Sequence, residues 1–551
     1  MPTYGINPYI SFVESRVFPG VVQHAVFHRL TGVIAEPDER VRSLLLAAKS
    51  GTPLLINEAD LQMRQLVQME FLIPKGHDPL ELLLDQYVTR PIQNPAIAYR
   101  SKTGEWILVR TSMLQAVYSR RLGELPEIVE EKLSPVAADI LLKADGTKTL
   151  RQVYNELQVE DSEFRSAIDF LTSQERQLIK FTVRPEELNE PFSLVNIIPR
   201  NLYHSERKDG DGITDFHLSG IEDAAWEFDQ IEPTVNHGFR FPHEALGGLN
   251  YGSRFCLATL RTEVVPLLNN SNALEVLEVG GGMGTFARAF LQQAASVNGT
   301  SINYHILDLS PALMASQRKI LAELLPESRH FQQDATEFDL PDHTFDLIIS
   351  NEVIADFPVA SLQRSNDGTW QGEGAYYLDK YNLTDKDAPD SFVVNAGVFR
   401  FLERAWKHLT PGGTLILSEY GSEQHYPAAS FNLNHDEFTI HFGHVVACAA
   451  KVGFQCRLLT LKEFLNFDTD VLVLDGREEH LLCLNHVLKD YGEVLPYAVI
   501  SKSDFEQRCR SVVEQTGLIG YSFSPLHKGF HFGPNIRDFL VLIMHKPEEE
   551  I

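Results

Sequence analysis

The stretch Leu274-Glu275-Val276-Leu277-Glu278-Val279-Gly280-Gly281-Gly282-Met283-Gly284-Thr285 decides the fold of this 551-residue chain. Its first six residues form an apolar-rich run that predicts a buried strand. Phe286 to Leu291 follows and predicts a helix. The glycines between them let the backbone pass close to a ligand. A strand, a glycine turn and a helix form the front half of a nucleotide-type site, although any tight turn of this kind favours glycine.

Three later segments predict strands that run out into polar residues: Tyr304 to Asp308, Phe331 to Ala335, and Phe345 to Glu352. The carboxyl ends of parallel strands meet at one edge of a sheet, where ligands bind. A carboxylate at Asp308 can accept hydrogen bonds from both hydroxyls of a ribose. The carboxylate of Glu278 would repel a phosphate group. The pattern therefore argues against NAD and favours a cofactor with a positive charge.

The pattern Glu278-x-Gly280-x-Gly282-x-Gly284 resembles the first motif of class I S-adenosylmethionine (SAM) methyltransferases. The resemblance implies an α/β, Rossmann-like fold with a seven-stranded, mostly parallel sheet, in which Phe539 to His545 is a last, antiparallel strand. It also implies that Glu278 faces the methionine end of the cofactor, Asp308 the ribose and Asp334 the adenine amino group. The expected SAM-binding residues are Glu278, Gly280, Gly282, Gly284, Asp308, Leu309, Asp334, Ala335 and Asn351. A Rossmann-like domain without catalysis is the alternative.

A narrower resemblance rests on four stretches: Tyr304 to Gln317, Ser350 to Val359, Glu419-Tyr420-Gly421, and Glu437 to Phe442. They are similar to the MidA family, bacterial relatives of the mitochondrial complex I assembly arginine methyltransferase. The resemblance implies N-methylation of arginine. The chain departs from the family at Gly281, Met283 and Gly443 and in a long spacer from Ala360 to Asp390, which leaves the substrate open.

The expected catalytic residues are Glu352, Asp356, Glu419 and His441. Methyl transfer needs a nucleophile held in line behind the methyl group. A guanidinium nucleophile also needs carboxylates to orient it. Glu352 and Asp356 are four residues apart and would share one face of a helical turn. With Glu419 they could form an acidic cup.

Alternatives stay open for two of these residues. Asp356 could instead cap a helix or pair at the surface, and His441 could be a base, a substrate contact or a packed side chain. His425, His435, His441 and His444 follow no established metal-binding spacing, so we expect no metal.

Residues 91–185 predict a unit that starts with a hairpin, Ala96 to Arg100 and Trp106 to Arg110. Helices at 134–142, 149–157 and 163–174 and a final strand at 177–181 follow. This order is similar to the PqqD-like fold, the winged-helix domain known as the precursor-peptide recognition element, and residues 1–90 resemble it more faintly. Such a domain would bind a peptide by adding a strand to an exposed edge such as Ala96 to Arg100. A winged helix with only structural contacts is the alternative.

We therefore expect four parts: a small α+β domain at 1–90, a PqqD-like domain at 91–185, a linker and helical lead-in at 186–270, and a methyltransferase domain at 271–551. Residues 236–243 of the lead-in could form a lid or substrate loop. The net charge of −27 disfavours nucleic acid, and no stretch approaches the length of a membrane span. The five cysteines form no CxxC pair, which favours reduced thiols in a cytoplasmic protein.

The expected function is a SAM-dependent methyltransferase that modifies a peptide or protein on arginine, as in the biosynthesis of ribosomally made, modified peptides. The N-terminal domains would deliver the substrate, and a homodimer stays open. One alternative is a small-molecule methyltransferase of secondary metabolism with structural N-terminal domains. The other is a non-catalytic assembly or binding factor.

Overall fold

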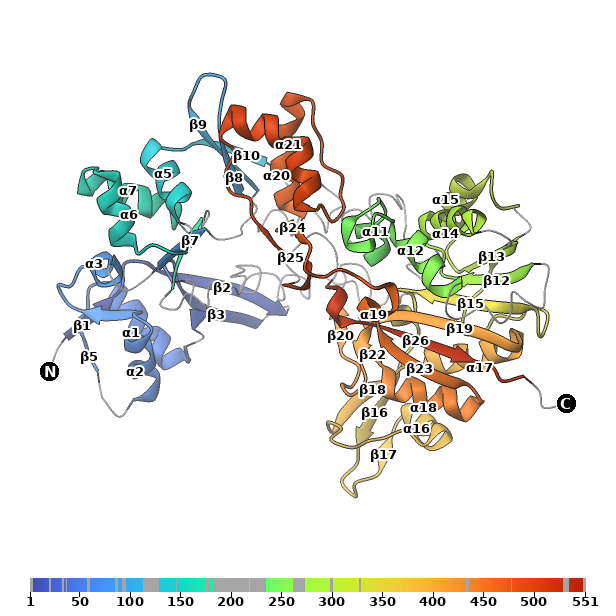
Figure 1. Ribbon diagram of the computed structural model, residues 1–551. Coiled ribbons are helices and arrows are strands. Elements are labelled where there is room, and N and C mark those ends of the chain that lie inside the picture. Colours follow the sequence, from blue (N-terminus) through green and yellow to red (C-terminus); the bar gives the residue numbers. More distant parts are fainter. Residues whose placement is uncertain are drawn as a thin grey trace. The chain divides into compact units, whose positions relative to one another are not determined.

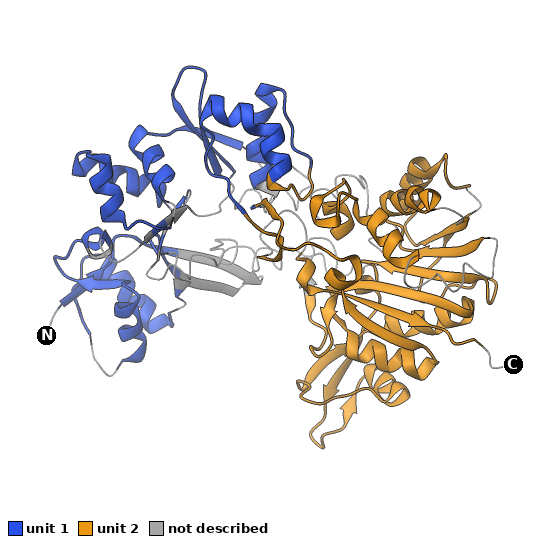
Figure 2. Cartoon of the chain, viewed as in Figure 1, with its two compact units in different colours: residues 1–207, 475–496, 503–523 blue, residues 208–474, 497–502, 524–551 orange. Residues whose placement is uncertain are grey.

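The computed structural model divides the chain into two compact units (Figure 2). Unit 1 comprises residues 1–207, 475–496 and 503–523, and unit 2 comprises residues 208–474, 497–502 and 524–551. The described residues are 3–18, 21–31, 34–35, 37–56, 60–84, 88–91, 96–111, 128–144, 146–173, 176, 178–182, 218, 234–260, 273–297, 301–326, 329–431, 436–476, 478–528 and 535–548. This division differs from the expected domain bounds, because residues 475–496 and 503–523 group with the N-terminal residues.

A sheet with seven strands along one path organises unit 2 (Figure 1). In spatial order the strands are β14 (His330–Gln332), β13 (Ile302–Asp308), β12 (Leu274–Val279), β15 (Phe345–Asn351), β19 (Leu409–Ser422), β26 (Phe539–His545) and β23 (Gln455–Thr460). Neighbours from β14 to β19 are parallel, and β26 runs antiparallel to both β19 and β23. The predicted Rossmann-like fold with an antiparallel last strand is thus confirmed.

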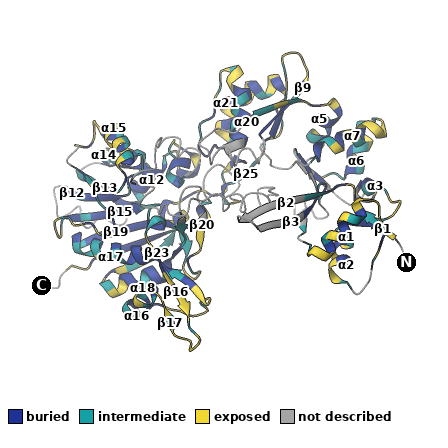
Figure 3. Ribbon diagram, turned by 180° about the vertical axis from the view of Figure 1, so that it is seen from behind, coloured by how far each residue is buried: buried dark blue, intermediate teal, exposed yellow. Residues whose placement is uncertain are grey.

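Two hydrophobic cores cover the two faces of this sheet, because successive strand residues face opposite sides. Leu274 and Val276 of β12 join one core, and Leu277 and Val279 join the other. The first core includes α12 (Tyr251–Ala258), α14 (Thr285–Ser296) and α19 (Leu461–Leu465), and the second includes α17 (Ala396–His408) and α18 (Phe442–Val452). Figure 3 shows the strands of the large sheet as mainly buried.

The other elements of unit 2 are short. They are α11 (Val235–Gly238), η3 (Glu244–Leu246), α15 (Pro311–Leu321), η6 (Ile354–Asp356), β16 (Ala360–Arg364), β17 (Trp370–Gln371), α16 (Gly374–Tyr381), β18 (Ser391–Val394), β20 (Ala429–Phe431), β21 (Asp436–Phe438), β22 (Ile440–His441), β24 (Leu472–Leu474), η8 (Leu526–Lys528) and η9 (Ile536–Asp538). The long spacer after β15 forms a small sheet of its own, in the order β17-β16-β18. The lead-in contributes α11 and α12, while residues 183–217 and 219–233 lie outside the described part.

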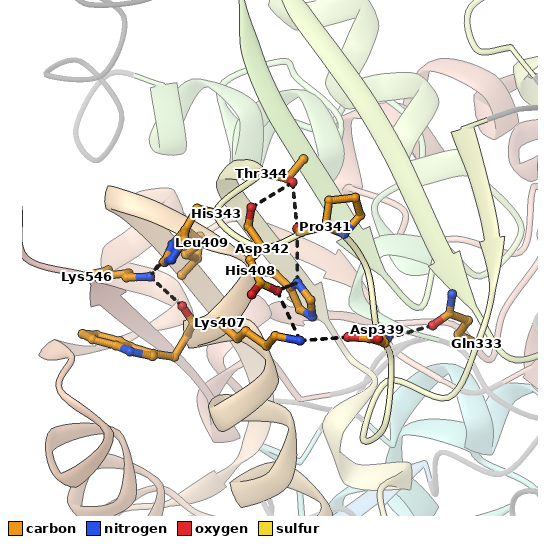
Figure 4. Close-up of polar contacts among 11 residues, drawn as sticks. Gln333, Asp339, Pro341, Asp342, His343, Thr344, Lys407, His408, Leu409 and Lys546 are labelled. Carbon is orange, nitrogen blue, oxygen red and sulfur yellow. Dashed lines mark hydrogen bonds and ion pairs between the residues drawn. The ribbon is translucent and has the colours of Figure 1, made fainter.

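A buried lysine holds the amino-terminal end of the large sheet together (Figure 4). Lys546, which follows β26, is 6% exposed. Its Nζ donates to the carbonyl oxygens of Trp406 and Leu409, both at 2.8 Å, and lies 3.1 Å from His343 Nδ1. These carbonyl groups end α17, where a lysine can satisfy them. The contact ties the last strand to a helix of the second core.

The described residues of the first part of unit 1 form two small sheets and three helices. Its elements are β1 (Thr3–Ile6), β2 (Ile10–Phe18), β3 (Val21–His28), β4 (Ile34–Ala35), α1 (Glu39–Lys49), β5 (Leu54–Leu55), α2 (Leu61–Gln68), β6 (Leu72–Pro74) and α3 (Pro79–Leu84). The sheets have the orders β5-β1-β6 and β2-β3-β4. Asp38 and Asp60 cap α1 and α2, because their carboxylates accept the backbone NH groups of Val41 and Met63.

The second part contains the predicted hairpin and helices. The strands are β7 (Val88–Pro91), β8 (Ala96–Arg100), β9 (Trp106–Thr111), β10 (Ile128–Lys132) and β11 (Ile179–Thr182), and the helices are α5 (Pro135–Lys143), α6 (Leu150–Leu157) and α7 (Asp161–Leu171). Thr149 caps α6 in a capping box with Gln152. The sheet order is β10-β9-β8, and β11 pairs with β7 instead of extending this sheet.

The C-terminal part of unit 1 closes the edge that we expected to bind peptide. It comprises α20 (Glu478–Leu488), η7 (Lys489–Tyr491) and most of α21 (Lys502–Thr516), before β25 (Phe523–Pro525). Ala98 of β8 donates to the carbonyl of Ile519 at 2.9 Å, and Ile519 donates back at 2.8 Å. The prediction of an exposed edge at Ala96 to Arg100 is therefore wrong at its centre.

Candidate active site

A glycine turn follows β12 and carries three residues with left-handed backbone. Gly280, Gly282 and Gly284 have φ angles of 71°, 49° and 86°, a region that favours glycine. A Cβ on Gly280 would collide with the side chain of Val353, whereas one on Gly282 would meet no heavy atom within 4 Å. The turn therefore requires glycine, and its open side at Gly282 is where a ligand can approach the backbone.

Glu278 is the next-to-last residue of β12 and is 2% exposed. Its Oε2 accepts a hydrogen bond from Tyr304 Oη at 3.1 Å. Burial raises the pKa of this carboxyl to about 8; the Tyr304 bond opposes the shift and the charge of Asp308 adds to it. A cation bound beside Glu278 would favour its charged form. The side chain therefore fits the positively charged sulfonium of SAM.

Asp308 ends β13, is 5% exposed, and accepts two hydrogen bonds that fix its carboxylate. Oδ1 accepts the NH of Ser310 at 2.9 Å, and Oδ2 accepts Gln317 Nε2 at 2.6 Å. Gln317 Nε2 also donates to the carbonyl of Gly282 at 2.9 Å. Gln317 therefore links the predicted ribose carboxylate to the glycine turn, and Leu309 lies half-buried beside it.

The predicted adenine position lies next to the ribose position. Asp334 follows β14, the neighbour of β13, and its Oδ1 accepts both the NH and the hydroxyl of Thr336, at 2.7 and 2.8 Å. The NH of Gln333 donates to the carbonyl of Asp308 at 3.2 Å. Ala335 is buried. The carboxyl ends of β12, β13 and β14 thus bring all the predicted cofactor residues from these strands to one edge.

Asn351 and Glu352 complete this edge at the end of β15. Tyr251 Oη donates to Asn351 Oδ1 at 2.6 Å, and Asn351 Nδ2 donates to Glu352 Oε1 at 3.1 Å. Glu352 also accepts the backbone NH groups of Val235 and Asn236, at 2.7 and 3.3 Å. Although the residue keeps some exposed surface, desolvation of the carboxyl raises its pKa to about 7 against these hydrogen bonds.

Glu419 is the centre of an acidic cluster at the carboxyl end of the sheet. It lies on β19, is 3% exposed, and accepts the NH groups of Tyr420 at 3.0 Å and Ala355 at 3.3 Å. Burial, and after it the negative charges around it, hold its pKa well above the ordinary value. The contributing neighbours are Glu352, Glu437 and Asp356. Glu352, Asp356 and Glu437 thus lie near enough to Glu419 to act on its charge, and that these acids form a cup for the substrate stays a prediction.

The helical turn that we expected to join two of these acids does not form. η6 covers only Ile354–Asp356, and Glu352 has a φ of 56°. A left-handed residue interrupts a helix. Glu352 and Asp356 therefore do not share one face of a helix, although they are four residues apart. The acids come together because β15 and β19 are adjacent in the sheet.

His441 ends β22 and directly precedes the first residue of α18. Its Nδ1 accepts the NH of His444 at 3.2 Å and caps α18, and the two imidazole rings stack at 3.8 Å. Burial lowers the pKa of His441 to about 4, and the ring is 2% exposed. A neutral capping imidazole is a poor base, so this geometry favours a packing role. His425 is exposed, and His435 lies outside the described residues.

Four residues of the site carried no role in the sequence analysis: Asn236, Tyr251, Gln317 and Glu437. Asn236 Nδ2 donates to Thr285 Oγ1 at 3.0 Å, and Tyr420 Oη donates to Glu437 at 3.4 Å. Gln317 and Glu437 lie within the stretches that resemble the MidA family, and this resemblance was the signal in the sequence that could have identified them. Asn236 lay in the stretch considered as a lid, and nothing in the sequence pointed to Tyr251.

No group of three His, Cys, Asp or Glu residues in the described ranges could hold a metal ion. Within the same ranges, no helix combines the length and apolarity needed to cross a membrane. All five cysteines are among the described residues, and none is in a disulfide.

Residues 256–427 match a family model described as "Putative S-adenosyl-L-methionine-dependent methyltransferase". No curated protein matches the chain. A solved structure from Burkholderia thailandensis with bound S-adenosyl-homocysteine (SAH) is 16% identical, with 56% of this chain and 82% of that chain covered and a TM-score of 0.31. Phosphoethanolamine N-methyltransferase 2 of Haemonchus contortus, with phosphomonomethylethanolamine and SAH, is 14% identical, with 62% of each chain covered and a TM-score of 0.32.

Proposed function

We propose that this SAM-dependent methyltransferase methylates arginine in a peptide or protein. The observation that carries the proposal is the acidic cluster of Glu419, Glu352, Asp356 and Glu437 at the carboxyl end of the sheet. Carboxylates hold a guanidinium by charge-assisted hydrogen bonds and fix its orientation. A neutral small molecule would make no use of so many desolvated acids.

SAM supplies a methyl group already activated on a cationic sulfur, so the chain mainly has to position the acceptor. Glu419 and Asp356 would hold the guanidinium with one nitrogen facing the methyl group. The new N–CH3 bond forms as the S–CH3 bond breaks, and the nitrogen then releases a proton. The bound guanidinium would favour the ionised form of Glu419, and the raised pKa of this carboxyl then suits it to accept the proton. His441, a neutral helix cap, has no part in this step.

Unit 1 would deliver the peptide, as the resemblance to the PqqD-like fold implies. Ile519 covers the β8 side of the sheet β10-β9-β8, so among the described strands of this sheet β10 is the edge at which a peptide strand would add. Glu131 of β10 accepts hydrogen bonds from Arg110 at 2.9 Å and Arg176 at 2.7 Å. These bonds lower the pKa of Glu131 to about 2, against its partial burial. A strand held in this way is a preorganised edge for an extended peptide.

The acceptor can be identified directly. The full chain, incubated with methyl-labelled SAM and a pool of short arginine-containing peptides, should place the label on arginine, as amino-acid analysis of the hydrolysed product shows. Label on another residue, or only on small metabolites of an added extract, would contradict the proposal. Asp356→Asn should then lower labelling strongly, whereas a small neutral acceptor would leave it unchanged.

The role of unit 1 needs a test in the full chain, since residues 475–496 and 503–523 belong to this unit. Successive NH groups of a strand point in opposite directions. Val129→Pro and Glu130→Pro therefore remove one inward and one outward NH of β10. The variant that keeps its circular dichroism should raise the KM of a long peptide and leave that of a short core fragment unchanged. An equal change in KM for the long peptide and for the short fragment would indicate that unit 1 has only a structural role.

A further inference from the structure

Residues 234–251, which we call the strap, cross the edge of the sheet where the cofactor residues meet. On one side, the strap contacts the end of β15. Glu352 accepts the NH groups of Val235 and Asn236, and Tyr251 Oη donates to Asn351. Each of these contacts joins residues about 100 or more positions apart in the chain. The bonds therefore fix the course of the strap over this strand end.

On the other side, the strap contacts the glycine turn. Asn236 Nδ2 donates to Thr285 Oγ1 at 3.0 Å, and Thr285 directly follows Gly284 as the first residue of α14. β12 and β15 are adjacent, with Val279 opposite Ser350. The glycine turn and Asn351 thus lie side by side at the carboxyl ends of adjacent strands, the usual ligand position in such sheets. The strap contacts both.

We infer that the strap closes over the cofactor and that Glu352 is the positioning residue that latches it. Opening the strap would be needed for SAM to enter and for SAH to leave, and closing it would keep water from the sulfonium. The inference requires SAM binding at the glycine turn, but it does not depend on the identity of the methyl acceptor.

The hydrogen bonds of Glu352 separate this role from direct contact with the substrate. Its two oxygens already accept three NH groups, from Val235, Asn236 and Asn351. Its left-handed backbone, with a φ of 56°, points the side chain to these partners and is strained for a residue with a Cβ. Glu352 therefore adds charge to the acidic cluster, but its carboxylate oxygens accept hydrogen bonds from the strap and from Asn351.

Amide hydrogen exchange of the ligand-free full chain tests the latch. In Glu352→Ala, exchange at Val235 and Asn236 should accelerate by about tenfold or more, because hydrogen bonds to a charged group are lost. Glu275→Gln is the matched control, since Glu275 lies at the other end of β12 and pairs with His305. Unchanged exchange at both amides in Glu352→Ala would overturn the inference.

The rate of SAH release, measured by stopped flow, tests the closure. It should rise by about tenfold in Glu352→Ala and by a smaller factor in Asn236→Ala, which removes only the bond to Thr285. Glu275→Gln should release SAH at the wild-type rate. Because Asn236→Ala leaves the buried acid in place, it keeps the test decisive if Glu352→Ala does not fold. Wild-type release rates in both strap variants would overturn the inference.

Discussion

The carboxyl of Glu278 makes the affinity for SAM depend on pH. In the ligand-free protein, burial raises its pKa to about 8, so the group is mostly protonated at pH 6. The positive charge of the sulfonium favours the ionised form, so binding releases a proton. The association constant for SAM should therefore rise with pH until the pKa is reached.

The magnitude follows from this single group. With a pKa of about 8, the ionised fraction rises from about 1% at pH 6 to about 50% at pH 8. The affinity for SAM should then rise by about fiftyfold, or about 2.3 kcal/mol. SAH has the same amino and carboxyl groups as SAM but a neutral sulfur, so its affinity should change much less.

Calorimetric titration of SAM and SAH at pH 6, 7 and 8 measures the effect, and the ratio of the two affinities removes titrations that both ligands share. Glu278→Gln should bind SAM more weakly at pH 8 and should show a flat ratio. A ratio that stays constant in the wild type, or that rises equally in Glu278→Gln, would refute the placement of the sulfonium beside Glu278.

Other predictions concern the cofactor site and stability. Gly282→Val should abolish SAM binding in calorimetry while circular dichroism is kept, because its side chain would fill the open side of the turn. Asp308→Ala should weaken SAM binding by about 1–3 kcal/mol through lost hydrogen bonds. Since the pKa of Glu278 is raised from 4.5 to about 8 on folding, the ligand-free protein should lose stability as pH rises across this range, and Glu278→Gln should reduce the loss. Lys546→Met should lower the free energy of unfolding by about 1–3 kcal/mol, as it leaves buried carbonyl groups unsatisfied, whereas the exposed Lys451→Met should change it little in the same denaturation assay.

The sheet of unit 2 could be predicted because its central strands are apolar-rich runs that are followed by glycine or by polar residues. Leu274–Val279 and Phe345–Asn351 are such runs, and their residues alternate between two cores. The predicted cofactor residues meet at one edge because parallel strands bring their carboxyl ends together. Asp308 and Asp334, on neighbouring strands, follow from the same rule.

Other features depend on contacts that leave no local pattern. The amides of Val235 and Asn236 bind Glu352 through backbone groups that any residue supplies. The pairing of Ala98 with Ile519 joins segments more than 400 positions apart, so an edge strand that looked exposed in the sequence is covered. The left-handed Glu352 also broke the helical spacing that we expected before Asp356.

The measurement that tests the central claim most directly is methyl transfer to a matched pair of peptides, identical except that one carries arginine and the other citrulline. Citrulline keeps the shape of arginine but has no charge. The account predicts label from SAM on the arginine peptide alone, and a loss of about a hundredfold or more in Glu419→Gln, as expected for a transition-state contact. Equal labelling of the two peptides, or full activity in Glu419→Gln, would contradict it.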